Sequence, residues 1–273
     1  MEARSDQPPT NLPKPQQQDE NLSQEFKNLM STLPMDEGWL STIPVYQYQG
    51  FWFEPMFLQA ILSCQKHFEA NDTDIIHVTF PKSGTTWLKA LTFALLNRNK
   101  YPPTQENNPL LVTNPHILVP PLHSLFYDEK FNIPNISQFP SPRLLSSHFP
   151  YISLPKSRKE FKWTILGSCF GVLERKLGKA RESNVSKVYE QMKSHPTLVL
   201  KELSEFIGCS FSQQELDNGM LDDILNLCSF DNLRNLEVNQ TGSVSSIRGF
   251  EIQNKSFFRC GKIGDSKNFL TND

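Results

Sequence analysis

The sequence contains little that would direct the chain to a membrane, a metal ion or a nucleic acid. No apolar run is long enough to span a bilayer, and residues 1–20 lack the apolar core of a signal peptide. The five cysteines form no Cys-x-x-Cys pair and no His/Cys cluster with zinc spacing. The net charge of −2 offers no basic excess for nucleic acid or an anionic membrane surface. We therefore expect a cytoplasmic protein in a reducing compartment, with no metal, nucleic-acid or membrane partner.

The composition nevertheless supports a folded core. Apolar residues make up 38% of the chain and aromatic residues 11%, with 20 phenylalanines among them. Such a chain can bury enough apolar surface to fold, and 273 residues allow one large α/β domain or two small ones. Residues 1–20 are rich in proline, glutamine and acidic side chains, so we predict a disordered tail there and a single folded domain over 21–273.

Residues 74–97 read as a buried strand, a tight turn and a helix. Isoleucine, valine, threonine and phenylalanine favour a strand before Pro81, and apolar residues at helical spacing predict a helix from near Trp87. A glycine in the turn lets backbone N–H groups approach an anion closely, and the helix start favours negative charge. Lys82 adds a positive charge, and Thr85 and Thr86 add hydroxyl donors. The lysine precedes the glycine, so this is not the nucleotide-triphosphatase loop, whose lysine follows it.

One of the six histidines differs from the others by its position. His148 follows a short predicted strand, 143–147, and ligands of parallel sheets bind beyond the carboxyl ends of the strands. It is about as plausible as a general base as it is as a structural residue. By contrast, His77 lies within the first strand and is expected to be packed in the core.

The remaining segments give coarser expectations. Helices are predicted over 21–33, 55–68, within 189–209 and within 211–227, and a further strand over 161–166. Residues 38–54, 99–121 and those after Ser229 read as loops, and the basic run at 158–187 reads as a solvated face. The dense aromatics between Trp39 and Phe53 suit core packing, or alternatively a pocket for an aromatic or steroid-like acceptor.

Several patches together resemble the plant-type cytosolic sulfotransferases. The resemblance covers about residue 33 to the end, and its main patches are YQGFWF at 48–53, TFPKSGTTW at 79–87, LLSSHFP at 144–150 and FFRCGKIGDSKNFLT at 257–271. It implies an α/β fold, a single domain with a central parallel sheet flanked by helices. It also implies transfer of a sulfonyl group from 3′-phosphoadenosine 5′-phosphosulfate (PAPS) to a hydroxyl of a small acceptor. Flavonoids, steroids, jasmonates and glucosinolate precursors are the acceptor classes it implies.

The resemblance also implies roles for individual residues. His148 would take the acceptor's proton, and Lys82 would stabilise the leaving phosphate oxygen, so these two would be catalytic. The 5′-phosphosulfate would be held by Lys82, Ser83, Gly84, Thr85 and Thr86. The nucleotide would be bound by Trp87, Tyr189 and Phe230, and its 3′-phosphate by the segment Arg259, Cys260 and Gly261. No metal is implied, and the oligomer would be a monomer or a weak homodimer.

The chain departs from the family pattern in two places. After Leu166 the family's basic segment and the serine-bearing helix that follows it have no counterpart, so we predict an internal deletion there. Cys260 stands where the family has lysine, Ser266 stands where it has tryptophan, and the chain ends soon after Thr271. We therefore predict an intact 5′-phosphosulfate half-site beside a damaged 3′-phosphate half-site and a shortened C-terminus.

Two further interpretations compete with the enzyme. One is a catalytically inactive, sulfotransferase-like protein that binds a small molecule in the acceptor pocket. The other, a kinase with a nucleotide-triphosphate loop, is weak because neither the required lysine order nor a magnesium-binding carboxylate is evident.

Overall fold

The computed structural model describes residues 24–38, 43–79, 81–127, 134–155, 164–167 and 188–263. For residues 164–167 and 188–190 it describes the backbone alone. The predicted N-terminal tail, the basic run at 158–187 (apart from the short strand 164–167) and the chain beyond residue 263 lie outside these ranges. The predictions made for them stay predictions.

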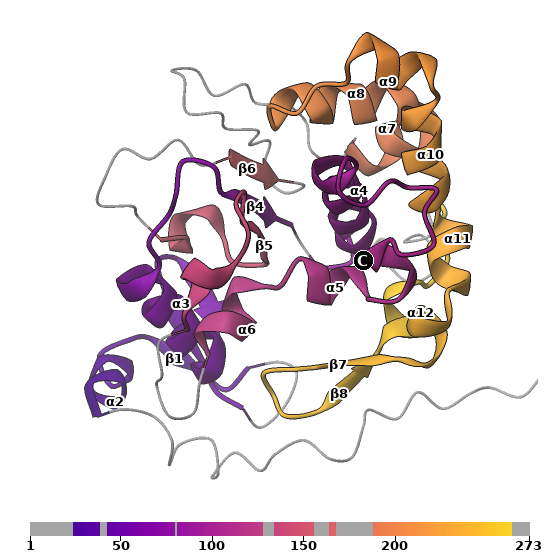
Figure 1. Ribbon diagram of the computed structural model, residues 1–273. Coiled ribbons are helices and arrows are strands. Elements are labelled where there is room, and N and C mark those ends of the chain that lie inside the picture. The colour runs from indigo at the N-terminus through magenta and orange to yellow at the C-terminus, as the bar shows by residue number, and fades with distance from the viewer. Residues whose placement is uncertain are drawn as a thin grey trace, which may run out of the picture.

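A parallel sheet lies at the centre of the molecule (Figure 1). Strand β4 (Ile75–Val78) lies between β5 (Leu144–Ser147) and β6 (Thr164–Gly167), and it runs parallel to both. The strands predicted at 75–80 and 143–147 are thus confirmed over 75–78 and 144–147, and part of the one at 161–166 is also found. Beside β5, the main chain of Pro120 accepts a hydrogen bond from the Ser146 N–H, which brings the 119–121 segment to that edge of the sheet.

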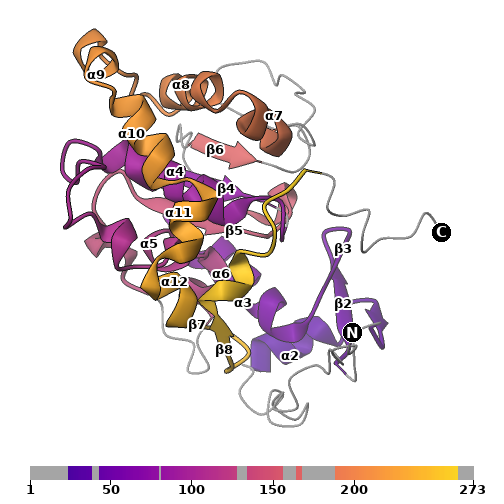
Figure 2. The same ribbon diagram turned by 90° about the vertical axis from the view of Figure 1, so that its right-hand side faces the viewer.

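Helices cover both faces of this sheet (Figures 1 and 2). Because alternate residues of a strand face opposite ways, Ile75 packs among residues of α4 (Thr85–Asn97), α8 (Pro196–Phe206) and α10 (Met220–Leu227). Ile76 and Val78 pack on the other side, against α3 (Pro55–His67) and α6 (Leu122–Phe126). This doubly covered parallel sheet confirms the predicted α/β fold class.

A buried ion pair joins the amino ends of β4 and β5. The Arg143 guanidinium donates from Nε and one terminal nitrogen to the two Asp74 oxygens, at 2.7 and 2.5 Å. The Arg143 and Asp74 side chains are 5% and 0% exposed, so the pair is desolvated and removing either partner would leave a buried charge. This end of the sheet is opposite the turn that joins β4 to α4.

The N-terminal region forms a small antiparallel sheet where the sequence predicts a loop. It consists of β1 (Met35–Asp36), β2 (Val45–Tyr48) and β3 (Phe51–Phe53), preceded by helix α2 (Gln24–Met30). The two-residue turn between β2 and β3 has φ of 53° at Gln49 and 84° at Gly50, the positive values that a tight hairpin requires. The loop prediction was wrong because it treats Pro44 and Gly50 as residues that interrupt a strand. Gly50 instead lies in the turn of a hairpin.

Short helices connect the sheet to its neighbours. The link after α4 contains η1 (Pro109–Leu111) and α5 (Pro115–Leu118), and the later links contain η2 (Ile136–Gln138) and η3 (Tyr151–Ser153). Residues 99–121 are therefore largely irregular, as predicted. In the ranges given above, the structure contains no helix that is long and apolar enough to cross a membrane.

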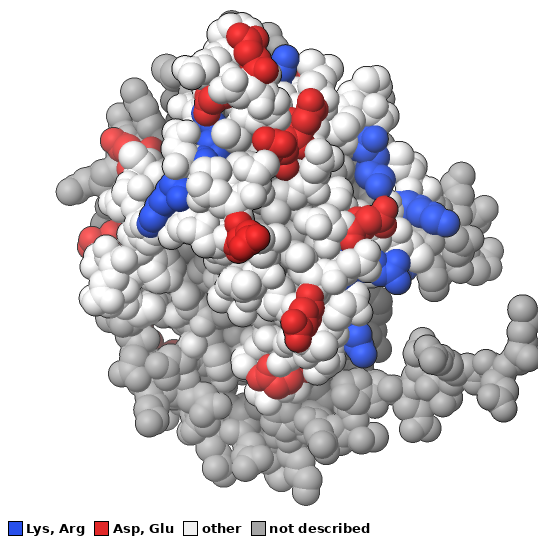
Figure 3. Space-filling view, turned by 45° about the vertical axis from the view of Figure 1, so that its right-hand side comes forward, with Lys and Arg blue, Asp and Glu red and all other residues white. Residues whose placement is uncertain are grey.

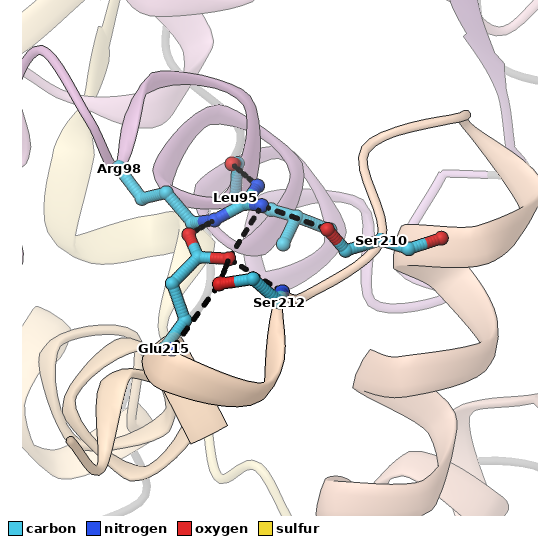
Figure 4. Close-up of polar contacts among 5 residues, drawn as sticks. All are labelled: Leu95, Arg98, Ser210, Ser212 and Glu215. Carbon is cyan, nitrogen blue, oxygen red and sulfur yellow. Dashed lines mark hydrogen bonds and ion pairs between the residues drawn. The ribbon is translucent and has the colours of Figure 1, made fainter. Parts of the chain in front are cut away.

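Between residues 188 and 227 the chain forms α7 (Val188–Ser194), α8, α9 (Gln213–Asp217) and α10. The single helix predicted within 211–227 is instead two helices, because Gly219 has a φ of 76° and separates them. Arg98, at the end of α4, donates to Glu215 at 2.6 Å and to the main-chain oxygens of Leu95 and Ser210 (Figure 4). Glu215 also completes a capping box with Ser212, so this ion pair fixes α9 against α4.

The C-terminal region is built from short elements, where the sequence predicts mostly loop. They are α11 (Phe230–Asn235), α12 (Glu237–Thr241), β7 (Ser243–Ser245), β8 (Glu251–Gln253) and η5 (Asn254–Phe257). A Cβ at Gly242 would lie 2.5 Å from the Val238 oxygen and 2.7 Å from Asn254 Nδ2, so only glycine fits this close approach. The prediction was wrong because elements of three to six residues carry too little periodicity to stand out from a loop.

Candidate active site

The turn between β4 and α4 has the backbone of an anion-binding loop. Lys82 has a φ of 66°, a left-handed value that is uncommon outside glycine, and Gly84 precedes the helix with a φ of 93°. Helix α4 starts at Thr85, two residues earlier than predicted, so Thr85 and Thr86 lie in its first turn. No acidic residue occupies that turn. The partial positive charge of the helix start is therefore not compensated from within the turn.

The two threonines of the first turn make different hydrogen bonds. Thr85 Oγ1 lies 2.7 Å from the hydroxyl of Thr79, at the end of β4, and both side chains are buried. Thr86 Oγ1 instead lies 2.9 Å from Nε2 of His116, in α5. The first contact fastens the turn to the strand, and the second joins it to a neighbouring helix.

Lys82 connects the turn to the C-terminal region. Its Nζ donates to the main-chain oxygen of Ser256 at 3.1 Å and lies 5.9 Å from the centre of the Phe257 ring. Burial lowers the pKa of Lys82, and the nearby positive charge of Arg259 lowers it further. The fold therefore places two cations close together at the turn, although 177 positions separate them in the sequence. An anion is the ligand that would relieve their repulsion.

The other residues predicted to bind the nucleotide come from α4, α7, α11 and the segment after η5. Gly261, with a φ of 63°, lies directly against Phe230, because a Cβ at 261 would come within 2.7 Å of that ring. Trp87 lies in α4, and the Lys193 Nζ from α7 lies 5.9 Å from the centre of its ring. Cys260 is exposed, with a free thiol. Tyr189 belongs to α7, but its side chain lies outside the described residues.

His148 lies immediately beyond β5, beside the turn. Its Nδ1 lies 2.6 Å from the main-chain oxygen of Thr79, which can only accept, so Nδ1 carries the proton of the neutral ring. Nε2 therefore keeps its lone pair. Burial lowers the pKa of His148, the Thr79 hydrogen bond raises it, and the field of Lys89 lowers it, with a net fall below 6.5. His148 is thus a neutral imidazole near pH 7, in the tautomer that a base requires.

Aromatic rings surround His148 on the side away from the turn. His123, in α6, stacks on it with ring centres 6.3 Å apart, and the Phe57 ring meets His123 edge-on at 5.5 Å. Burial lowers the pKa of His123 to about 3, so this second ring is neutral as well. On this side His148 is therefore lined by neutral rings, which suits an apolar acceptor body.

A cluster of basic side chains behind the turn was not predicted from the sequence. It consists of His77 on β4, Lys89 on α4 and His116 on α5. His77 is 0% exposed and Lys89 is 1% exposed. The Lys89 Nζ lies 3.2 Å from His116 Nδ1. His77 is packed in the core, as predicted. A signal for Lys89 was available: Thr85, Lys89 and Thr92 form a buried polar stripe on an otherwise apolar helix face.

Charge on the surface does not by itself mark a binding face. Acidic and basic side chains are interspersed over the face seen in Figure 3. A group of three or more histidine, cysteine or acidic side chains that could hold a metal ion is absent from the part of the chain that the structure describes. The attraction for an anion at this site is therefore local, and it comes from the turn, Lys82 and Arg259.

Comparison with known proteins places this geometry in context. Residues 72–169 and 159–273 match a family model described as a sulfotransferase domain. Cytosolic sulfotransferase 12 of Arabidopsis thaliana is 39% identical over 301 aligned positions, which include 93% of this chain and 89% of that protein. Those 301 positions outnumber the 273 residues of this chain, so some of them have no residue here. The deletion after Leu166 stays a prediction, because its surroundings lie outside the described residues.

Solved structures of similar fold lead to the same family. A candidate steroid sulphotransferase of Arabidopsis thaliana has a TM-score of 0.63 and 37% identity, with 83% of this chain and 90% of that chain covered. The mouse sulfotransferase SULT7A1, solved with 3′,5′-adenosine diphosphate (PAP), has a TM-score of 0.53 and 20% identity, with 84% and 90% covered. The second likeness, at this identity, concerns the fold alone.

Proposed function

This chain belongs to the sulfotransferase domain family, and from that premise we propose that it transfers a sulfonyl group from PAPS to a hydroxyl of a small acceptor. When bound, PAPS supplies an activated sulfonyl group whose leaving group is a phosphate oxygen. The single observation that carries the assignment is the position and tautomer of His148. A neutral imidazole with a free Nε2 lone pair lies next to a cationic anion-binding turn.

His148 is the base in this proposal. The carbonyl oxygen of Thr79 holds its Nδ1 proton, so Nε2 can take the proton of an acceptor hydroxyl. The imidazolium that forms keeps its Nδ1 hydrogen bond to the same carbonyl, which stabilises it. Its lowered pKa keeps most of the ring unprotonated, and hence active, at neutral pH.

The residues of the turn fit a phosphosulfate. We assign its binding to Lys82, Ser83, Gly84, Thr85 and Thr86, which combine a cation, two threonine hydroxyls and the helix start. Lys82 has no carboxylate partner among the described residues, since its contacts there are a main-chain oxygen and an aromatic ring. It can therefore neutralise charge that develops on a leaving phosphate oxygen.

The nucleotide part is assigned to residues around Phe230. Phe230 and Trp87 offer aromatic surfaces for a base, Tyr189 is proposed to contact the nucleotide from α7, and Arg259, Cys260 and Gly261 form the segment for the 3′-phosphate. Arg259 supplies the charge of that segment, because Cys260 stands where the family resemblance implies a lysine. This loss is the observation that favours the second candidate, an inactive protein that binds the acceptor.

The acceptor is proposed to be a small hydroxylated compound with an apolar body. The aromatic and histidine rings beside His148 support an apolar body, and the family supports a hydroxyl. The Arabidopsis relatives are named cytosolic, and we propose a cytoplasmic location for this chain as well. We propose a monomer or weak homodimer with no metal, nucleic-acid or membrane partner.

Calorimetric titration with PAP tests the donor site directly. We expect saturable binding to one site, because the turn and Arg259 together hold two phosphates. If no binding is detectable at about 1 mM PAP, the binding free energy is weaker than about 4 kcal/mol. That result would exclude the proposed sulfotransferase activity. If PAP binds, radiolabelled PAPS offered with hydroxylated apolar compounds shows whether sulfonyl transfer follows, and binding without any transfer favours the inactive alternative.

A further inference from the structure

We propose that Lys89 and His116 form a hydrogen-bonded relay that aims the Thr86 hydroxyl at the sulfonyl donor. Both are then positioning residues, because they act through Thr86 and do not touch the donor themselves. The inference rests on the proposed function, since Thr86 belongs to the turn assigned to the phosphosulfate.

The relay is a continuous chain of hydrogen bonds through three residues on two helices, α4 and α5. The Lys89 Nζ on α4 lies 3.2 Å from Nδ1 of His116 on α5. The other ring nitrogen of His116, Nε2, lies 2.9 Å from Oγ1 of Thr86, back in the first turn of α4. Lys89 is 1% exposed, so its head group cannot satisfy its hydrogen bonds in bulk water.

The charge state of Lys89 decides which groups donate and which accept along the relay. An ammonium group only donates, so a charged Lys89 makes His116 Nδ1 an acceptor and leaves the ring proton on Nε2. Nε2 then donates to Thr86 Oγ1, and the Thr86 hydroxyl proton is free to point at an anion. A neutral Lys89 amine can accept from Nδ1 instead, and Nε2 would then accept the Thr86 proton and withdraw it from the donor.

Binding of an anion and protonation of Lys89 therefore favour each other. Burial lowers the pKa of Lys89 to about 7, so the free protein holds a mixture of both forms near neutrality. An anion at the turn stabilises the ammonium, which takes a proton from the solvent. The titratable or charged groups that face the relay are His77 on β4, His123 on α6, His148 beyond β5, and Lys82 in the turn. All four are basic, and no ion pair to Lys89 occurs among the described residues.

Two further contacts hold the His116 ring in place. Its face stacks on Phe257 with ring centres 4.0 Å apart, and Phe257 belongs to η5, which also contacts Lys82. Its main-chain N–H donates to the Asn114 side chain, and that fully buried side chain bonds to Asn239 of α12. The relay is thus fixed by the same C-terminal region that carries Arg259.

Calorimetry on Lys89→Met tests the relay, with Lys100→Met as the matched control. Both variants remove one lysine charge, but Lys100 is exposed after the end of α4. We expect Lys89→Met to weaken PAP binding about tenfold or more, as when a charge-assisted hydrogen bond is weakened, and Lys100→Met to leave it unchanged. We also expect Thr86→Val to weaken binding, and Lys89→Met to add little in the double variant.

Proton uptake on binding separates positioning from simple packing. Titration in buffers of different ionisation enthalpy at about pH 7.5 should show that the wild type takes up more protons with PAP than Lys89→Met does. Equal PAP affinity and equal uptake in the two proteins would overturn the relay. Thermal unfolding without ligand serves as the folding check, and Lys89→Met should unfold no earlier than wild type near pH 6.5 because it removes a buried charge.

The tautomer of His116 provides a test that needs no ligand. Nitrogen-15 NMR of the histidine rings, assigned with His116→Gln, should show His116 protonated on Nε2 below about pH 7. Protonation on Nδ1 there would overturn the relay even if PAP binds. Conversely, a wild type that binds no PAP would overturn the proposed function, while the His116 tautomer would still decide the direction of the relay.

Discussion

His148 and His116 lie near the same end of the parallel sheet, yet their surroundings give them opposite tautomers. Nδ1 of His148 faces a carbonyl oxygen, which leaves its Nε2 as a base, whereas Nδ1 of His116 faces Lys89, which leaves its Nε2 as a donor when the lysine is charged. Both rings are partly buried, and loss of hydration lowers the pKa of each. The partner at one nitrogen therefore decides whether a histidine accepts a proton or presents one.

The two histidines therefore have different roles at the proposed site. His148 acts on the acceptor, and His116 acts on the donor through Thr86. Substitutions at the two ends should consequently have separable effects on turnover and on donor binding.

The largest effect on turnover is expected from His148→Ala. Loss of a general base lowers the rate by about 10² to 10⁴-fold, and PAP affinity should stay within about twofold, since the carbonyl of Thr79 remains in place. Steady-state turnover and calorimetry measure the two quantities. Turnover equal to that of the wild type would refute His148 as the base and with it the contrast between the histidines.

Lys82→Met comes next, because Lys82 acts on the donor directly. Loss of its charge should weaken PAP binding by about 10 to 100-fold, more than Lys89→Met does through the relay. It should also lower turnover, in contrast to His148→Ala, which spares binding. If Lys82→Met weakened PAP binding less than Lys89→Met does, the claim that Lys82 contacts the donor directly and Lys89 acts through the relay would be contradicted.

Turnover, which depends on His148, and PAP affinity, which depends on Lys89, should also respond to pH in opposite directions. The folded pKa of His148 lies below 6.5, so turnover at saturating substrates should persist below pH 6.5 and fall only when Nε2 is protonated. The pKa of Lys89 is about 7, so PAP affinity should fall as the pH rises above about 7 and the ammonium is lost. Profiles of turnover and of PAP affinity over about pH 5.5 to 9 measure both limbs. Two limbs that change in the same direction would contradict the opposite roles.

The smallest effect on chemistry is expected from Glu215→Gln, far from either histidine. The Arg98 hydrogen bond lowers the pKa of Glu215 from 4.5 to about 2, so its stabilisation is present above about pH 4.5 and is lost as the pH falls toward 2. The substitution should cost about 1 to 3 kcal/mol of unfolding free energy at neutral pH. Urea unfolding measures this cost, and PAP affinity should not change. A weakened PAP affinity would show that the helix pairing in Figure 4 reaches the donor site.

Much of the fold was predictable because the pattern of apolar residues is local. Strands at 75–78 and 144–147 and helices at 55–67 and 85–97 follow from runs and spacings that the sequence displays directly. The hairpin at 45–53 and the short elements after Ser229 were missed, since each is stabilised by contacts with distant segments. Gly242 illustrates this, because its need for glycine arises from Asn254, twelve positions away.

The candidate site divides in the same way. The turn at 81–87 and His148 could be named from the sequence, because a glycine beside a lysine and a histidine at a strand end are local signals. Lys89 and His116 could not be paired, since 27 positions separate them and only the packing of α5 on α4 brings them together. Arg259 was assigned from resemblance, and its effect on the Lys82 pKa appears only in the folded chain.

The sequence by itself determined the α/β class and the strand–turn–helix that carries Lys82 and the two threonine hydroxyls, because each depends on residues close together in the chain. Only the tertiary structure decided which nitrogen of each histidine holds the proton. That choice depends on whether the neighbouring group in space is a carbonyl oxygen or a lysine, and nothing in the local sequence of either histidine specifies that neighbour.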